Sequence, residues 1–314
     1  MRKPFDVAFI SLTCGLALAC DSGNGGSKDT DVELPDDTNT HETPEQKKWK
    51  VSVVESDVGI GATLDVNADG TVGIAYFGNH STIDGECTEI VFNESSTKNR
   101  ERYELKFATK SLDDSEWQIE TVDNPIYVAV PEAPSFKYTL DGHPAIAYRG
   151  GDPEIAYCGA NDAFYTVKQG DTWNSETAAA NSNDALANDE ASDAGFGVGF
   201  FPALTLDPDG EPAIVYQDQH FVYLQRDDDS RADAELAWRR GGGWMNEPVD
   251  FGAGAGTANA IIFDSENRPI VFSAIPIESH GVSRHGVWAY RRNDDGTWDR
   301  IQIVSAGSTP GNSF

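Results

Sequence analysis

Hydrophobic runs return four times along the chain with the same order of apolar and turn residues. In each case an apolar run leads into a short stretch rich in Asp, Asn, Gly or Pro, and a second apolar run follows. The segments are ATLDVNADGTVGIAYFG from Ala62, YTLDGHPAIAYRG from Tyr138, LTLDPDGEPAIVYQD from Leu204 and IIFDSENRPIVFSA from Ile261. Because β-branched and aromatic runs bounded by such turns are typical of antiparallel strands, each predicts a β-hairpin. The expected anchors of the turns are Asp65, Asp141, Asp207 and Asp264.

Two further hydrophobic runs follow each hairpin. The first is a run such as ELKFATK from Glu104 or GVWAYRR from Gly286, and the second opens on a tryptophan. The tryptophans are Trp49, Trp117, Trp173, Trp244 and Trp298. The run WQIETV alternates between apolar and polar residues, as a half-exposed outer strand does, whereas AIAY and AIVY are nearly unbroken apolar runs typical of inner strands. Each unit therefore predicts a four-stranded antiparallel sheet.

The repetition of this unit favours one architecture. A four-stranded sheet that cannot bury both faces alone must stack on its neighbours, and repeats of this length in an all-β sequence indicate a propeller or a solenoid. A β-sandwich would not explain why the same order returns four times. We therefore predict an all-β protein, a β-propeller of four-stranded antiparallel blades, with four recognisable blades plus an extra strand.

The number of tryptophan runs bears on how the ring closes. Five such runs accompany only four hairpins. Either Trp49 opens a strand that closes the ring onto the last blade, or the C-terminal SAGSTPGNSF leads into a blade that this chain lacks. The favoured interpretation is four blades plus an unpaired strand, in a propeller that is incompletely closed or truncated.

The N-terminus carries an export signal. Arg2 and Lys3 precede an uncharged run over residues 7–19, which has the length of a signal-peptide core and is too short to span a bilayer. The run ends in Ala17-Leu18-Ala19-Cys20, which resembles the lipobox of bacterial lipoproteins. The resemblance implies that Cys20 is acylated and anchors the protein to a membrane. The alternatives are an ordinary secretory peptide and a buried apolar strand.

Composition divides the rest of the chain. Residues 21–48 contain no aromatic residue and almost no aliphatic ones, so they cannot bury enough surface to offset the entropy of ordering. The predicted organisation is a signal peptide at 1–19, a disordered acidic tether at 20–48 and a propeller domain at 49–314. The formal net charge of the whole chain is -29, from 52 acidic and 23 basic residues. This excess of negative charge excludes nucleic acid as a partner.

Cysteine use agrees with export. Cys14 lies in the signal and Cys20 at the lipid site, so Cys87 and Cys158 remain in the mature domain. In an oxidising compartment these two predict a disulfide, which would stabilise by ~4 kcal/mol on the chain-entropy model. Two free thiols are the main alternative. A zinc site is a remote one, because no Cys-x-x-Cys or histidine cluster lies near either cysteine.

One turn carries the beginning of a metal motif. In DVNADG, the residues Asp65, Asn67 and Asp69 provide oxygens at positions 1, 3 and 5 of a calcium loop, and Gly70 permits the sharp turn. Position 12 falls on Tyr76, where a bidentate Glu is needed. The sister segments keep turn residues without the ligand series, so a plain hairpin turn is the favoured interpretation and calcium the alternative.

The repeats resemble known propellers. The pattern aliphatic-x-Asp-x-x-Gly-x-Pro-x-Ile-Ala-Tyr over residues 49–304 is similar to that of bacterial β-propeller lipoproteins, and NDDGTW from Asn293 resembles, one residue short, the Asp box of sialidase-type propellers. The second resemblance would imply an arginine triad on inner strands. Arg149 follows such a strand, but Phe77, Gln217 and Ser273 are at the equivalent places. The sialidase pattern therefore fails where its chemistry would be.

Other candidate site residues recur by position. Asp152, Asp218 and Glu278 follow the second strand in three repeats, and glycoside hydrolases on propellers use two or three carboxylates near the central channel. Solvated loop charges are the favoured interpretation. Aromatic residues recur within the second strand, where packing between blades is favoured over a ligand-lining role. They are Tyr76, Tyr148, Tyr216 and Phe272.

The function expected from the sequence is non-catalytic. We expect an exported, lipid-anchored protein of the bacterial cell envelope, whose propeller binds an unknown protein or glycan through its loops, with no cofactor except possible calcium. The alternative is a carbohydrate-active enzyme, a sialidase-like or other glycoside hydrolase with carboxylates at the channel mouth. A truncated, unstable fragment is the third hypothesis.

Overall fold

The computed structural model describes ten stretches of the chain. They are residues 51–56, 59–91, 94–127, 131–151, 161–181, 195, 197–219, 232–251, 254–275 and 286–305. The chain divides into the units Met1–Val51 and Ser52–Phe314, and every element below belongs to the second. None of the described stretches forms a helix that could cross a membrane.

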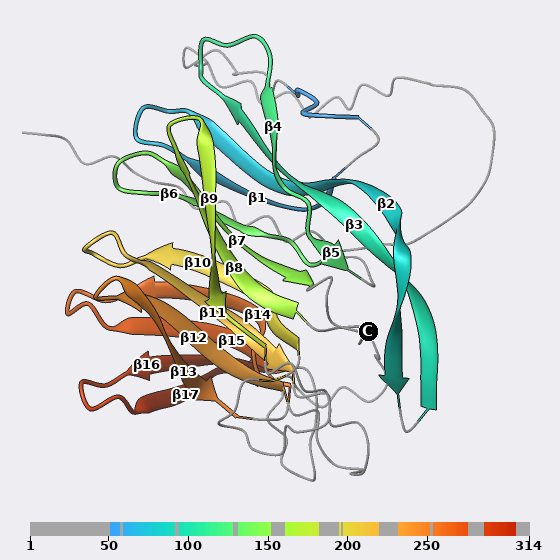
Figure 1. Cartoon of the computed structure of the whole chain (residues 1–314). Coiled ribbons are helices and arrows are strands. Elements are labelled where there is room, and N and C mark those ends of the chain that lie inside the picture. Colours follow the sequence, from blue (N-terminus) through green and yellow to red (C-terminus); the bar gives the residue numbers. More distant parts are fainter. Residues whose placement is uncertain are drawn as a thin grey trace, which may run out of the picture. The chain divides into compact units, whose positions relative to one another are not determined.

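Four units, each of four antiparallel strands, follow one another along the chain (Figure 1); short strand pairings join the first three units into one 13-stranded sheet, and the last unit is a separate four-stranded sheet. Blade one consists of β1 (Ile60–Val66), β2 (Val72–Val91), β3 (Glu94–Lys110) and β4 (Gln118–Asp123), and blade two of β6 (Ser135–Tyr138), β7 (Pro144–Gly151), β8 (Asn161–Gln169) and β9 (Thr172–Ala179). Blade three consists of β10 (Gly197–Leu206), β11 (Pro212–Gln219), β12 (Ala232–Arg240) and β13 (Gly243–Asp250), and blade four of β14 (Thr257–Phe263), β15 (Pro269–Ile275), β16 (Gly286–Arg292) and β17 (Trp298–Ser305). In each blade the strands pair in chain order, which confirms the predicted unit and the propeller architecture.

The extra strand differs from the expected one. Trp49 lies outside the described residues, and residues 51–53 are not in a strand. Instead the short β5 (Ile126–Tyr127) pairs with both β3 and β7, and thereby links blade one to blade two. Among the described residues no strand pairing joins blade four to blade one.

The hairpin turns share one hydrogen-bond pattern. The N–H of Asp207 donates to the carbonyl of Glu211 at 2.9 Å, and the N–H of Gly210 donates back to the carbonyl of Asp207. Equivalent pairs begin at Asn67, Thr139 and Asp264. The predicted turns are thus confirmed, but two of their predicted anchors are wrong: Asn67 and Thr139 replace Asp65 and Asp141, because Asn and Thr also suit the first position of such a turn.

Left-handed backbone explains the small residues of these turns. The fourth turn position has φ of +87° at Gly70 and +88° at Gly210, a region that glycine enters without steric cost. In the fourth hairpin Asn267 adopts φ of +58°, which Asn tolerates better than most side chains do. The turn residues are therefore set by backbone conformation.

Each of blades one to three buries a hydrophobic face against the next blade. We call the side of a blade toward the preceding blade its front face and the side toward the following blade its back face. Phe107 on the back of blade one meets Trp173 on the front of blade two, with ring centroids 5.6 Å apart, and Tyr165 and Trp244 repeat this contact between blades two and three. Trp298 packs into the core between blades three and four. The tryptophans therefore mark the interfaces between blades.

The register corrects one recurring position. Ala203 pairs with Val215 on β11, and its equivalent Ala260 pairs with Phe272 on β15. Phe272 therefore corresponds to Val215, and the buried Ser273 takes the place of Tyr216. A one-residue slip in a strand moves every side chain to the other face, so Phe272 lies on the back of blade four.

Candidate functional site

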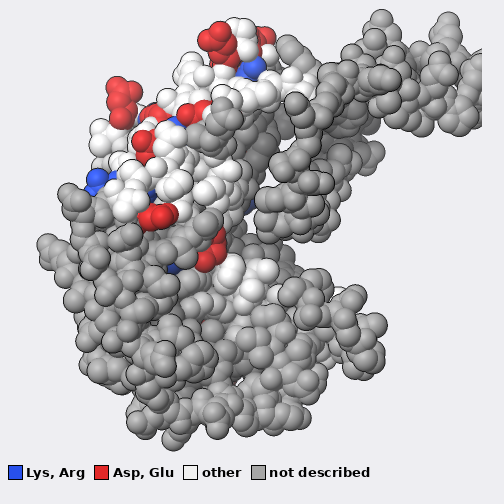
Figure 2. All heavy atoms as spheres, turned by 90° about the vertical axis from the view of Figure 1, so that its right-hand side faces the viewer, with Lys and Arg blue, Asp and Glu red and all other residues white. Residues whose placement is uncertain are grey.

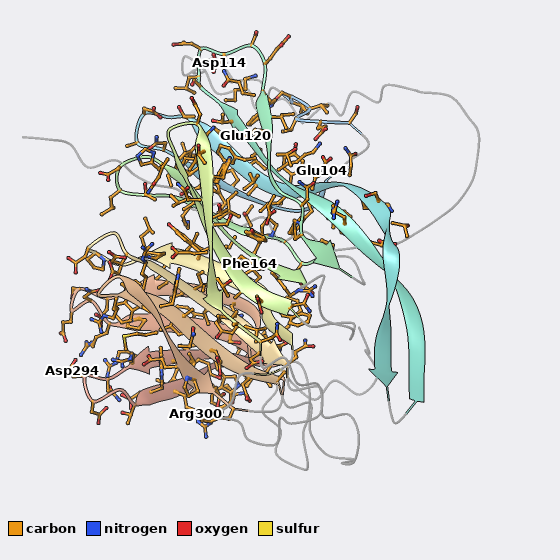
Figure 3. All side chains as sticks on the ribbon, in the orientation of Figure 1. Glu104, Asp114, Glu120, Phe164, Asp294 and Arg300 are labelled. Carbon is orange, nitrogen blue, oxygen red and sulfur yellow. The ribbon has the colours of Figure 1, made fainter. Side chains whose placement is uncertain are left out.

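The two ends of the blades differ in chemistry. At one end lie the tight turns, including those that hold Asp114 and Asp294 (Figure 3). At the other end lie the connections from the second strand to the third strand of each blade, and from the fourth strand to the next blade. We call this the loop end. Buried polar side chains gather near the loop end: Lys106, Arg149, Asn161, Asn181, Gln217, Asp218, Asp233, Glu235 and Asp250. This end is the candidate functional site.

Three carboxylates lie on the front face of blade three. Asp218 on β11 is directly opposite Asp233 on β12, and both are buried. Directly opposed side chains in an antiparallel pair have Cβ atoms ~5 Å apart. Glu235 lies two residues further along β12 and accepts a hydrogen bond of 2.7 Å from the hydroxyl of Tyr216. Burial raises the pKa of Tyr216 well above its usual value, and the charges of Glu235 and Asp218 add to this. Such a group of acids could exchange protons with a bound ligand.

A backbone segment fixes Asp218. The N–H of Gly195 donates to Asp218 Oδ2 at 2.7 Å. A Cβ atom at position 195 would lie 2.0 Å from Asp218 Oδ1, so only glycine fits there. Asp218, expected as a solvated loop charge, is instead fully buried within a strand.

Arg149 is held between blades two and three. Its Nε and Nη2 donate to Glu132 Oε2 at 2.9 and 2.8 Å, and its guanidinium carbon lies 4.0 Å from the centre of the Phe200 ring. A cation over an aromatic face is stabilised by the ring quadrupole. The next residue, Phe201, has φ of +50°, which is strained for an aromatic side chain. The arginine therefore ties β7 to β10.

The other positions equivalent to Arg149 carry no arginine. Phe77 and Gln217 are at these places as expected, whereas the equivalent in blade four is Ala274, because Ser273 corresponds to Tyr216. The Nε2 of Gln217 donates to the carbonyl of Ala255 at 2.8 Å, which ties blade three to the strand connection entering blade four. The arrangement is structural rather than a triad.

Tyrosines and acids join consecutive blades near the loop end. The hydroxyl of Tyr148 donates to Asp123 of blade one, and that of Tyr290 donates to Asp250 of blade three at 2.6 Å. Tyr148, at the recurring aromatic position of the second strand, thus makes a contact between blades as expected, whereas Tyr290 lies on the third strand of its blade, β16. In blade three Tyr216 uses Glu235 of its own blade instead.

The residues of the calcium motif are engaged in backbone bonds. Asp65 Oδ2 accepts from the N–H of Tyr138 at 3.0 Å, Asn67 Oδ1 from Ala68, and Asp69 Oδ1 from Thr71. The bond from Thr71 lowers the pKa of Asp69. Within the described stretches no group of three or more His, Cys, Asp or Glu could hold a metal ion. Calcium at Asp65, Asn67 and Asp69 stays a prediction.

Several predicted residues fall outside the description. Cys20, Asp152, Cys158 and Glu278 are not among the described residues. Cys87 lies on β2 opposite Lys98, and its side chain is not described. The predicted disulfide and lipid site therefore stay predictions.

Sequence reasoning missed the acids that follow the tryptophans. Asp123 and Asp250 are each the sixth residue after a tryptophan, and Glu120 and Glu247 are the third. Figure 3 places Glu120 on β4. This spacing was visible in WQIETVD and WMNEPVD, and it could have indicated contacts between blades.

Comparisons with known proteins give similarity to solved structures alone. No family model matches the chain, and no curated protein matches its sequence. A protein of unknown function from Dyadobacter fermentans is 14% identical, with 84% of this chain and 71% of that chain covered and a TM-score of 0.46. A xylan β-1,4-xylosidase from Bacillus halodurans is 12% identical, covering 77% and 43%, with a TM-score of 0.39. An α-L-arabinanase from Penicillium chrysogenum is 9% identical, covering 79% and 83%, with a TM-score of 0.43. No function follows from these values.

Proposed function

We propose that the protein is a non-catalytic binding module of the bacterial cell envelope. The observation that supports this is that charged groups near the loop end form contacts that hold the blades together. Asp123 and Asp250 accept hydrogen bonds from tyrosines of the following blades, and Arg149 binds Glu132 and stacks on Phe200. Groups committed to holding blades together provide a rigid scaffold, on which connecting loops bind a partner.

The location belongs to the same proposal. The N-terminal signal at 1–19 directs export, Cys20 carries the lipid, and residues 20–48 separate the propeller from the membrane. The resemblance of the repeats to those of β-propeller lipoproteins supports this arrangement. In that compartment Cys87 and Cys158 form a disulfide.

The negative charge of the protein favours a protein or a glycan as its partner. Acidic side chains lie in several separate places on the described part of one face, among fewer basic ones (Figure 2). With a net charge of -29, the surface repels nucleic acid and other polyanions. A neutral glycan or a basic protein surface fits it best.

Binding measurements with the full chain test the proposal. A glycan array and a pull-down from envelope extracts, each with and without calcium, should give a saturable partner whose binding survives Asp218→Asn. A pull-down partner that binds equally to heat-unfolded chain, or no partner in either assay, would count against the proposal.

A glycoside hydrolase is the second candidate, and one observation favours it. Asp218, Asp233 and Glu235 form a group of carboxylates on one face of blade three. Glycoside hydrolysis needs two carboxyl groups ~5–10 Å apart, one as acid and one as base or nucleophile. A panel of aryl glycosides tests it: hydrolysis by the full chain that is lost in Asp233→Asn and kept in the turn variant Asp295→Asn would establish this candidate over the first.

A further inference from the structure

The back face of blade four differs from the other three back faces. The third residue after the strand tryptophan is Glu120, Glu176 or Glu247 in blades one to three, and each binds a cation of the next blade. In blade four this residue is Ile301, which is 63% exposed. In blade four, the glutamate that pairs with a cation of the following blade is therefore replaced by an exposed aliphatic side chain.

A recurring bulge shows the same difference. One extra residue interrupts the pairing of every fourth strand, five positions after the tryptophan, at Val122, Ala178, Val249 and Ile303. Val249 is 7% exposed, because it packs into the core against blade four, whereas Ile303 is 54% exposed. The bulge side chains of blades one to three are thus covered fully or in part, whereas that of blade four is exposed.

Other aliphatic residues extend this face. Ile262 and Val287 are exposed and alternate with Ile261 and Trp288, which pack toward blade three. Val304, also exposed, follows the bulge at the place taken by Asp123 in blade one and Asp250 in blade three. An uncovered patch of this kind marks an interaction site. We call Ile262, Val287, Ile301, Ile303 and Val304 the terminal patch.

The front face of blade one is exposed where the front faces of the other blades are buried. Leu64 pairs with Ile74 as Phe136 pairs with Ile146, so the two residues are equivalent. Phe136 is 2% exposed between blades one and two, but Leu64 is 58% exposed. Val66 on the same face is also exposed. This face therefore presents apolar groups that are buried in the other front faces.

The segment Ser52–Glu55 covers part of the same face, as a fourth strand would. Glu55 is the sixth residue after Trp49, and its Oε2 accepts from the Tyr76 hydroxyl at 2.8 Å. This repeats the bond from Tyr148 to Asp123, and Asp250 likewise accepts from a tyrosine of the next blade, Tyr290 on its third strand. Ser52 Oγ accepts from the Trp117 indole at 3.3 Å. Among the described residues no strand pairs with this segment.

We propose that the terminal patch and the front face of blade one seat three antiparallel strands of a partner polypeptide, which Ser52–Glu55 completes as the fourth strand of a fifth blade. Both halves correspond in position to faces that consecutive blades bury against each other, and on the front face of blade one the bond from Tyr76 to Glu55 repeats the bond from Tyr148 to Asp123. The partner needs three strands only, since the outer one is present in this chain.

The terminal patch also specifies the chemistry of the partner's third strand. In blades two to four this strand carries Lys168, Arg239 or Arg292, which bind the glutamates of the preceding blade. Opposite Ile301 such a cation would be desolvated without a partner, which is costly. The third strand of the partner therefore carries an uncharged residue at this position.

A second copy of this chain fits the patch poorly. Its free front face is that of blade one, which has Lys110 at the cation position, with Nζ donating to the Ser115 carbonyl at 3.0 Å. Stacking that face on the patch would bring Lys110 to Ile301, and two chains with a net charge of -29 repel each other.

A three-stranded probe tests the proposal on the full chain. The probe is a fragment copying residues 197–240, the first three strands of blade three, with either the native Arg239 or Arg239→Leu. Calorimetric titration should give one site, at least tenfold tighter for the leucine fragment. Ile301→Lys in the full chain should weaken binding at least tenfold, and Leu112→Lys, at an exposed turn residue, should leave it unchanged.

A second measurement tests the proposal even if the free fragment does not fold. The leucine fragment is appended to Phe314 of the full chain, and hydrogen exchange is compared with a chain that carries the same residues in scrambled order. Slower exchange of the amides at residues 301–304 and 64–66 supports the proposal. Equal exchange overturns it, and so does a dimer of the unmodified chain that Ile301→Lys converts to monomer.

Discussion

The ion pair between blades three and four allows a quantitative test of blade stacking. Arg292 Nε and Nη2 donate to Glu247 Oε1 and Oε2 at 2.5 and 2.9 Å, so both carboxylate oxygens are bound. The hydrogen bonds to Glu247 raise the pKa of Arg292. The two side chains are 20% and 25% exposed, less than the 32% and 37% of Arg239 and Glu176 between blades two and three.

A double-mutant cycle with Arg292→Met and Glu247→Gln measures the coupling of this pair. Bidentate contact and partial burial place the expected coupling at about 1.5 kcal/mol, above the ~0.2–1 kcal/mol of exposed pairs. The single-contact pair Arg239–Glu176, at 2.8 Å, should give about 0.5 kcal/mol in the same host. The difference follows from geometry and burial, since both pairs join equivalent positions.

Urea unfolding of the full chain, followed by tryptophan fluorescence, provides the free energies. Adding 1 M NaCl should reduce the coupling of Arg239–Glu176 more than that of Arg292–Glu247, because exposed pairs are screened more strongly. A coupling for Arg292–Glu247 near zero, or smaller than that of Arg239–Glu176, would refute the assigned interface.

Three further predictions concern a turn, a buried phenol and a glycine. Asp207→Ala should lower stability by ~2–3 kcal/mol, because its carboxylate accepts from the Asp209 and Glu211 amides and from the Trp238 indole; urea melts measure this. Burial raises the pKa of Tyr165 to about 12. The protonated phenol therefore contributes its full stabilisation below the unfolded-state pKa of about 10, and this contribution is lost as the pH rises toward 12. Urea melts across this range should show a smaller fall in stability with pH for Tyr165→Phe, and an unchanged pH profile would contradict the prediction. Gly195→Ala should cost at least ~2 kcal/mol because of the contact with Asp218, whereas Gly243→Ala, in open space, should stay within ~0.5 kcal/mol, and equal melting of the two variants would contradict the packing.

The blade unit could be predicted because its signals are local. Alternating and unbroken apolar runs define outer and inner strands, and a tryptophan opens each outer strand. The anchors of two turns could not be predicted by matching aspartates, since Asn67 and Thr139 serve the same position. Chemically equivalent turn residues hide the register.

Side-chain faces were harder to predict than strands. Phe272 and Ser273 are adjacent, and the sequence pattern favoured the aromatic residue at the tyrosine position. Pairing with Ala260 shows the opposite assignment. Because strand side chains alternate, one residue of misalignment reverses the face.

The candidate site was only partly predictable. Asp218 was identified from its place after the second strand, but its partners Asp233 and Glu235 lie beyond a long connection whose length conceals which residues are opposed. Asp123 and Asp250 could have been found from their constant distance to Trp117 and Trp244.

Zero-length cross-linking tests the stacking of blades most directly. A carbodiimide joins an amine to a carboxylate only when they touch, and Lys168 Nζ lies 2.6 Å from Glu120 while Lys106 Nζ lies 2.8 Å from Glu55. Mass spectrometry of the treated, digested full chain should therefore find amide bonds between Lys168 and Glu120 and between Lys106 and Glu55. Lys168 joined instead to an acid distant from blade one, with Glu120 unmodified, would contradict the stacking of the first two blades.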